Sequence, residues 1–403
     1  MDYCQELAQN QAELAQMYKA KKRPVCPCKT PGIEMYIAKV GDRYIIKRMP
    51  DTGPLHSPDC DSYEPPPELS GLGDVLGSAI KEDTDSGLTE LRFSFSMSRV
   101  PGRKPADSTS DEDDSVKTDG NKLTLRSTLH YLWEEAGFHK WTPAMEDKRN
   151  WYVIRKHLLL AAGDKLNKGR TLADQIFIPE TFSQDKKTAI KQHWLGLVSR
   201  LAPQSHGPKQ LMILIGEIKE IMPARYGGQL IIKHAPDIKF FTPDDLQKKL
   251  EKRFCDELMF HQDLPDVHLM TIATFSVNVA GSAMIEEIAL MPVTSTWIPF
   301  ETIHDKALID HLVEHKRRFT KGLRYNLPKS KPLASVVLPD THPAPTAMYI
   351  LPAQPEEEYQ AAIEQLQSES QLASWVWDSS EFEIPELPPA MAHAQRNSEQ
   401  KGA

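Results

Sequence analysis

The chain has 403 residues, of which 40% are hydrophobic and 26% are charged, and its formal net charge is -8. This composition is typical of a globular protein of two or three domains, and it provides no general attraction to nucleic acid. No apolar run approaches the roughly 20 residues of a membrane-spanning helix. The first 23 residues also lack the apolar core of a secretory signal. We therefore expect a cytoplasmic protein that has no membrane partner.

The first 68 residues are predicted to form an N-terminal helix and a β-hairpin module. Two strand-like runs, 34–40 and 43–49, are joined by the two residues Gly41 and Asp42. A two-residue loop that contains glycine is the commonest connection of a hairpin. Because a hairpin brings its two ends together, residues just before the first strand are expected to lie close to residues just after the second.

Cysteine and histidine side chains flank this hairpin on both sides. Cys26 and Cys28 precede it, and His56 and Cys60 follow it. Three thiolates and one imidazole are a ligand set of closed, tetrahedral zinc sites, which supply folding energy to modules with little core of their own. We predict that these four residues bind one structural zinc ion. The alternative is a set of reduced thiols beside a surface histidine. Cys4, on the N-terminal helix, is a poorer ligand candidate.

The remaining chain divides into segments of different composition, so we predict a multidomain α+β fold. The expected segments are a bridging strand segment (69–97), a disordered acidic linker (98–121), a helical module (122–205), a β-rich region with one helix (206–296), an α/β domain (297–389) and a disordered tail (390–403). The single helix of the β-rich region is expected to start at Thr242-Pro243-Asp244 and to run through Leu258. Cys255 lies beside its apolar stripe, so we expect this thiol to be buried.

The α/β domain resembles the core of restriction-endonuclease-like nucleases in the order of its elements. In that comparison Glu301, Asp305 and Asp340 are the candidate ligands of a catalytic Mg²⁺. The strand at 346–351 has neither the carboxylate nor the lysine that active members carry there. We therefore interpret the domain as a degenerate, inactive nuclease core, with an active nuclease and a generic α/β domain as alternatives.

Basic and aromatic residues alternate in two clusters that are candidates for holding phosphates and stacking on bases. The candidates are Lys148, Arg149, Trp151, Arg155 and Lys156 in the helical module, and Arg317, Arg318, Lys321 and Arg324 in the α/β domain. The competing interpretation is a pair of solvent-facing surfaces with a core tryptophan. The common phosphate-binding, dinucleotide-binding, metalloprotease and hydrolase motifs do not occur.

Four stretches, RPVCPC, HSPDCDSYEPP, LRSTLHYLWEEAGFHKW and RRFTKGLRYN, resemble the bacterial family called domain of unknown function 1173. The resemblance extends over about residues 23–389. It implies a place among the genes of plasmids and integrative conjugative elements, and it implies no reaction. We therefore predict a non-enzymatic accessory protein that binds DNA, or a conjugation or DNA-processing protein, with a protein-only scaffold as the further alternative.

Overall fold

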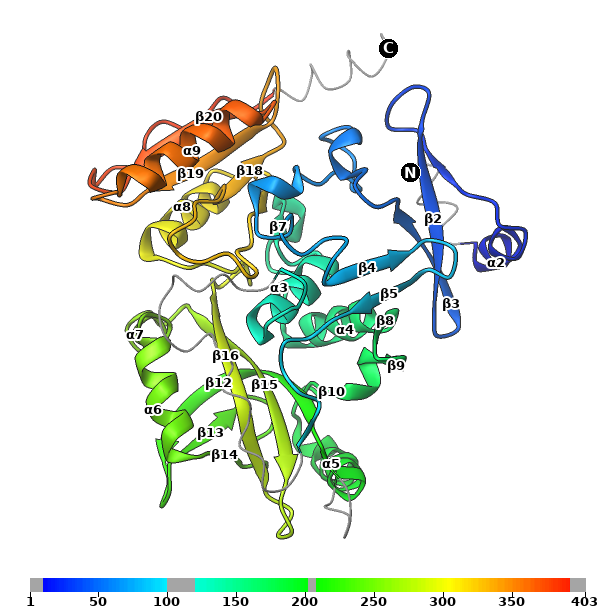
Figure 1. The fold of residues 1–403 in the computed structure, drawn as a ribbon, viewed down its shortest axis with the longest axis vertical. Coiled ribbons are helices and arrows are strands. Elements are labelled where there is room, and N and C mark those ends of the chain that lie inside the picture. The colour runs from blue at the N-terminus through cyan, green and yellow to red at the C-terminus, as the bar shows by residue number, and fades with distance from the viewer. Residues whose placement is uncertain (1–9, 100–119, 202–207, 392–403) are drawn as a thin grey trace.

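The computed structural model describes residues 10–99, 120–201 and 208–391. These residues form a mixed α+β structure with several small sheets and eight α-helices. Figure 1 shows an N-terminal hairpin on one side, a C-terminal sheet on the other, and a β-barrel below them. Cys4, nearly all of the predicted linker and most of the predicted tail lie outside the described residues. No helix among the described residues is long and apolar enough to cross a membrane.

The N-terminal hairpin forms as predicted. Its elements are α2 (Gln11–Lys19), β1 (Val25–Cys26), β2 (Ile33–Val40) and β3 (Arg43–Arg48), followed by the 3₁₀ turns η1 (Gly53–Leu55) and η2 (Pro67–Leu69). The three strands pair in the order β1-β2-β3. Gly41 turns the hairpin with a φ of +59°, a conformation that glycine adopts without steric cost. Leu14 of α2 packs against Ile37 and fastens the helix to the sheet.

The middle of the chain contains the predicted helices, a strand of the predicted bridging segment (β5, Leu88–Leu91) and further short strands that the sequence did not indicate. The helices are α3 (Leu125–Glu135), α4 (Trp151–Ala162) and α5 (Lys187–Leu201). A four-stranded sheet has the order β4 (Ile80–Asp83), β5 (Leu88–Leu91), β8 (Lys165–Asn167) and β9 (Arg170–Thr171). A smaller pair joins β6 (Ser98–Arg99) to β11 (Lys209–Gln210). Thr124 and Asn150 cap the first turns of α3 and α4 by accepting backbone N–H groups.

Five strands of the β-rich region close into a small barrel. They are β12 (Met212–Pro223), β13 (Gly228–Ile232), β14 (Phe240–Thr242), β15 (His268–Val277) and β16 (Ala283–Val293). Around the barrel the order is β12-β13-β14-β16-β15, and β15 pairs again with β12. The short strand β10 (Ile176–Phe177) lies parallel to β12. The pairings are antiparallel except that β14 and β16 are parallel and β10 and β12 are parallel.

The predicted single helix of this region is two helices, α6 (Asp244–Arg253) and α7 (Cys255–Asp263). The chain leaves the helical conformation at Phe254, where φ is -116° and ψ is 33°. Phe254 is buried at this break, and the prediction for its neighbour was wrong, because Cys255 is exposed. The new helix axis after Phe254 turns the thiol away from the apolar stripe that the sequence periodicity indicated.

The C-terminal sheet has the order β20-β19-β18-β17-β7. Its elements are α8 (Ile303–Glu314), β17 (Phe319–Lys321), β18 (Val336–Leu338), β19 (Thr346–Leu351), α9 (Glu357–Glu369) and β20 (Ala373–Asp378), with β7 (Lys140–Trp141) from the middle of the chain. Strands β17, β18 and β19 are antiparallel neighbours, and β19 and β20 are parallel. At its edge, Trp141 of β7 stacks on Phe319 of β17.

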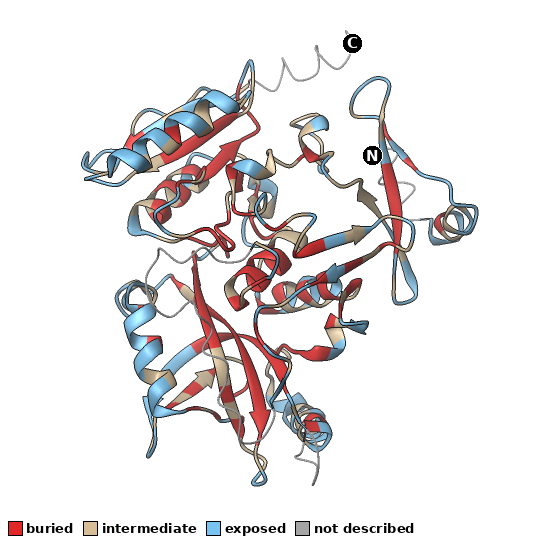
Figure 2. Cartoon of the chain, in the orientation of Figure 1, coloured by how far each residue is buried: buried red, intermediate tan, exposed pale blue. Residues whose placement is uncertain are grey.

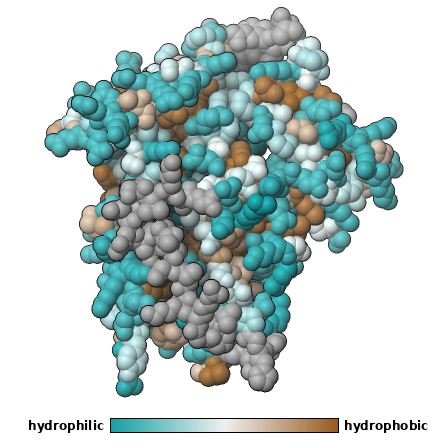
Figure 3. Space-filling view, viewed as in Figure 1, coloured by the Kyte–Doolittle hydropathy of each residue, from teal (hydrophilic) through white to brown (hydrophobic). Residues whose placement is uncertain are grey.

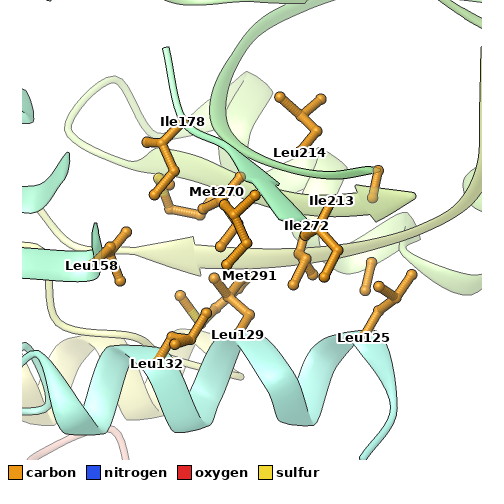
Figure 4. Close-up of a cluster of buried hydrophobic side chains, with 14 of the residues drawn as sticks. Leu125, Leu129, Leu132, Leu158, Ile178, Ile213, Leu214, Met270, Ile272 and Met291 are labelled. Atoms are coloured by element: carbon orange, nitrogen blue, oxygen red, sulfur yellow. The ribbon is translucent and has the colours of Figure 1, made fainter. Parts of the chain in front are cut away.

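The largest hydrophobic core joins segments that differ in composition. It includes side chains from α3, α4, the barrel and Tyr325 of the C-terminal segment, so the predicted boundaries do not separate independent cores. Figure 4 shows Leu125, Leu129 and Leu132 of α3 directed toward Met270 and Met291 of the barrel. The buried residues gather where helices meet strands (Figure 2). The visible outer surface is mainly hydrophilic with small hydrophobic patches (Figure 3).

Candidate metal centre

The four predicted ligands converge at the open end of the N-terminal hairpin. Cys26 lies on β1, which pairs with the start of β2, and Cys28 lies in the turn that connects these two strands. His56 ends the 3₁₀ turn η1, and Cys60 lies in a turn closed by its own N–H to the carbonyl of Ser57. The hairpin therefore places two ligands before it and two after it, as the sequence spacing predicts.

The distances among the ligand atoms fit one tetrahedral ion. All four atoms lie within 4.8 Å of one another. The Sγ atoms of Cys26 and Cys60 are 3.7 Å apart, and Nδ1 of His56 is 3.3 Å from Sγ of Cys28 and 3.7 Å from Sγ of Cys60. Ligands about 2.0–2.3 Å from a tetrahedral ion lie about 3.5–3.8 Å from one another. The donor set thus has the spacing and the chemistry of a closed metal site.

The surroundings of the thiols stabilise negative charge. The backbone N–H groups of Ser57 and Ser62 donate to Sγ of Cys28 and of Cys60, each at 3.4 Å. Hydrogen bonds of this kind favour the ionised form of a ligand. Three thiolates and one divalent ion carry a net charge of about -1, and basic side chains nearby offset it. Arg48, Lys29 and Lys140 are the cations that interact electrostatically with His56.

In the protein without metal, the same site favours neutral ligands. Burial raises the pKa of the Cys26 and Cys60 thiols. Burial also lowers the pKa of His56, as do the neighbouring cations. A divalent cation reverses this preference for the thiols, so metal binding releases protons and depends on pH. Nε2 of His56 is buried and has no hydrogen-bond partner within the described ranges, so the imidazole is fixed by its Nδ1 contacts.

We call residues 23–68, which carry the four candidate ligands, the metal module. Glu64 joins this module to the rest of the chain. Its carboxylate is paired with Arg48 at 3.3 Å, with His139 at 3.2 Å and with Lys140 at 2.7 Å. A second contact pairs Asp59 with Arg318 at 3.4 Å. All of these residues except Asp59 line a pocket of about 430 Å³ between the module, the end of α3 and the edge of the C-terminal sheet. Acidic side chains of the metal module therefore pair with basic side chains of the rest of the protein around this pocket.

The three carboxylates of the alternative nuclease site do not form a shared ligand group in the described structure. Each is paired with a different cation instead. The pairs are Glu301 with Arg324, Asp305 with Lys321, and Asp340 with Arg317. The three cations were predicted to contact phosphates, and the three carboxylates were the candidate Mg²⁺ ligands. In the structure the two sets form ion pairs with each other. All three cations are buried.

The basic cluster around α4 separates into a buried part and an exposed part. Arg149 donates to the backbone carbonyls of Gly137, Phe138, Lys140 and Thr296, and burial lowers its pKa to about 10. Trp151 is buried and donates to the carbonyl of Pro179, while Arg155 donates to the carbonyl of Ile178.

The exposed part consists of Lys148 just before α4, and Tyr152 and Lys156 on it. We call these three residues the α4 stripe. Tyr152 is 63% exposed. Arg318 of the other predicted cluster also reaches the surface, but it is paired with Asp59.

A second group of side chains that could bind a metal ion lies at the C-terminal end of α8. The ligand atoms of His311, Glu314 and His315 lie within 4.8 Å of one another on the helix surface. Nδ1 of His315 contacts the carbonyl of His311 at 2.8 Å, which leaves Nε2 of His315 free for another partner. The spacing H-x-x-E-H, which places all three on one face of a helix, is the sequence signal that would have indicated this group.

The structure is thus an α+β protein with a cluster of three cysteines and one histidine that could hold a metal ion. A family model described as "Protein of unknown function (DUF1173)" matches residues 4–380. The chain belongs to this family, as its sequence resemblance indicates. No curated protein matches it significantly, and no solved structure does either.

Proposed function

We propose that this protein is a non-enzymatic accessory protein of a bacterial mobile element, in which a structural zinc ion holds the N-terminal module in place while the body binds DNA or a DNA-processing protein in the cytoplasm. The observation that carries the proposal is the closed set of Cys26, Cys28, His56 and Cys60. A catalytic zinc site keeps one coordination position for water or substrate, whereas a set of four protein ligands fills the tetrahedron.

The C-terminal segment supports the absence of catalysis in this proposal. Its order of α8, three antiparallel strands, α9 and a parallel strand is the order expected for a nuclease-like core. Arg317, Lys321 and Arg324 neutralise the carboxylates that would hold the catalytic ion. An ion pair of this kind would have to break before a carboxylate ligated Mg²⁺, and breaking a buried pair costs about 3–5 kcal/mol.

The α4 stripe supports direct contact with DNA. Lys148 and Lys156 are exposed on either side of Tyr152. Two cations within reach of neighbouring phosphates release counterions on binding, which makes the affinity fall with salt. Zinc fits the centre better than a hard cation does, because thiolates and imidazole are preferred by zinc and carboxylates by Mg²⁺ and Ca²⁺.

Metal analysis of the purified full-length chain tests the structural role. We expect about one zinc per chain, loss of that zinc when Cys26→Ser and Cys28→Ser are combined, and increased proteolysis of residues 23–68 in the variant. Cys255→Ser is the matched control, because this thiol is exposed and lies outside the cluster, so it should retain the metal. A metal-free protein whose N-terminal module resists proteolysis as well as the metal-loaded one contradicts the proposal.

Binding of a labelled duplex by the metal-loaded protein tests the DNA contact. Combining Lys148→Ala with Lys156→Ala should lower the slope of log affinity against log salt by nearly 2, at about 0.9 per phosphate contact. Lys81→Ala, an exposed lysine on β4, is the control and should leave the slope unchanged. Absence of duplex binding at low salt would favour the protein-only scaffold.

A further inference from the structure

The order in which the barrel strands pair identifies the type of barrel, which the amino-acid sequence alone did not indicate. Taking β12 to β16 as strands one to five, their order around the barrel is 1-2-3-5-4-1. Strands three and five are parallel, and the helices α6 and α7 connect strands three and four. This is the order of the oligonucleotide- and oligosaccharide-binding fold, a five-stranded Greek-key barrel. In such barrels ligands lie over strands two and three, between the loop joining strands one and two and the loop joining strands four and five.

The corresponding outer face here carries a row of apolar and amide side chains. Met222, Gln229, Phe241 and Met284 are consecutive partners across four neighbouring strands. On β13, β14 and β16 the residues that alternate with them, such as Phe240, are buried in the barrel, so the row faces outward. With strands about 4.8 Å apart, the row is about 14 Å long. We call it the barrel row.

The side chains of the barrel row do not belong to the hydrophobic core. Met222 is 42% exposed, while Gln229, Phe241 and Met284 are half-buried. None of the three apolar members packs with the core cluster formed by the described residues. Helices α3, α5, α6 and α7 pack against β15 and β16. The barrel row therefore presents partly exposed apolar groups and one amide on the side where this barrel type binds its ligands.

The loop between β12 and β13 places an aromatic ring and a cation at one end of the row. Tyr226 is 70% exposed, and the guanidinium of Arg225 lies 5.4 Å from its ring centroid. The loop is fixed by Gly227, whose N–H donates to Asp244 at the start of α6. A Cβ at Gly227 would lie 1.9 Å from the carbonyl oxygen of Thr242, so only glycine allows this close approach. The backbone next to Tyr226 is thus tied to the start of α6.

The second loop and one further cation complete the surface. Residues 278–282 connect β15 and β16, and Oδ1 of Asn278 accepts the N–H groups of Ala280 and Ser282. Val279 at the loop tip is 93% exposed. Lys239 is exposed immediately before β14, two residues from Phe241.

We infer that the barrel row, together with Arg225, Tyr226 and Lys239, binds single-stranded nucleic acid. Aromatic rings stack on bases of any sequence, and cations at the edge of the surface pair with the phosphates. A duplex keeps its bases stacked inside, so it offers no base face to Tyr226 or Phe241. This surface is separate from the α4 stripe, and the inference does not depend on the role proposed for that stripe.

Fluorescence anisotropy of the zinc-loaded, full-length chain tests the inference. The probes are labelled oligothymidine and oligouridine of about 12 nucleotides, within the roughly 4–16 nucleotides that one such barrel covers, and a duplex of the same length. We expect both single strands to bind more tightly than the duplex at about 50 mM salt. A preference for DNA or for RNA would show that the sugar is also read, and either preference supports the inference.

Loop variants locate the binding surface. Tyr226→Ala should weaken single-strand binding about tenfold, the lower part of the range for losing one stacked base, whereas Tyr226→Phe should bind as the natural protein does. Arg225→Ala should lower the salt slope by about 0.7. Phe382→Ala is the control, because this ring is fully exposed elsewhere on the surface, and it should change nothing.

Three results would overturn the inference: no binding of either single strand at low salt, equal single-strand affinity of Tyr226→Ala and the natural protein, or tighter binding of the duplex than of the single strands by the chain in which Lys148→Ala and Lys156→Ala are combined. The variants of Lys148 and Lys156 separate this inference from the proposed duplex contact. They are expected to reduce duplex binding and to leave single-strand binding at the barrel unchanged, so either proposal can fail while the other stands.

Discussion

Replacing Glu64 by Gln removes the charge that joins the metal module to the body of the protein and keeps the size of the side chain. The Glu64 side chain is 12% exposed, and its partners Arg48, His139 and Lys140 are 33%, 2% and 22% exposed. Removing one partner of a buried ion pair costs about 3–5 kcal/mol. Because Arg48 and Lys140 keep access to water, we expect Glu64→Gln to lower the free energy of unfolding by about 3 kcal/mol, the lower end of that range.

The effect of Glu64 should disappear in acid. Burial alone would raise the pKa of its carboxyl, but Lys140, His139 and Arg48 together hold it well below the ordinary value of 4.5. A depressed carboxyl pKa stabilises the fold above the pKa of the unfolded chain, and this stabilisation is lost as the pH falls through the folded pKa. The difference between Glu64→Gln and the natural protein should therefore be complete at pH 7 and shrink below pH 4.5.

Urea unfolding of the zinc-loaded protein, followed by tryptophan fluorescence, measures this difference. Glu34→Gln is the matched control, because Glu34 is 63% exposed and pairs with Arg23 at the surface. An exposed pair contributes about 0–1 kcal/mol, so the control should unfold almost as the natural protein does. Equal losses for the two variants, or a loss for Glu64→Gln that persists unchanged below pH 4, would refute the role of Glu64 as a buried joint.

Two further predictions concern the barrel and a buried histidine. Gly227→Ala should destabilise the protein by at least about 2 kcal/mol, because its Cβ would meet the carbonyl of Thr242 at a φ of +81°; Gly41→Ala, with a φ of +59° and no atom within 4 Å, should cost only about 1 kcal/mol in the same thermal unfolding assay. Burial lowers the pKa of His130 to about 3, so the stability that its neutral ring provides is complete above pH 6.5 and declines as the pH falls toward 3. His130→Gln should flatten this decline, and the exposed His342→Gln should not, as measured by urea unfolding at a series of pH values.

The convergence of Cys26, Cys28, His56 and Cys60 was predictable because their arrangement is local in the sequence. One tight turn, at Gly41, aligns the two strands, and all four residues lie within 12 residues of the strand ends. The start of α4 followed from Asn150 in the same way, since a capping side chain and the apolar periodicity act over a single turn of helix.

The fate of the basic residues was not predictable, because it depends on groups that are distant in the sequence. Arg149 is held partly by the carbonyl of Thr296, and Arg317 by Asp340. The sequence around a basic residue does not indicate whether its side chain will face water or pair with a distant carboxylate in the folded protein. Closure of the barrel likewise depends on pairing β12 with β15, which strand propensity alone does not specify.

The two residues of β7 have a consequence for any attempt to produce the C-terminal segment alone. Lys140 and Trp141 cover the edge of β17, although some 180 residues separate them from it in the chain. A fragment starting near residue 297 would expose that edge and the ring of Phe319. Because an exposed strand edge can pair with another chain, we expect such a fragment to aggregate. During synthesis the same edge closes only after β17 has emerged, so this sheet is one of the last parts of the molecule to form and an early place for misassembly.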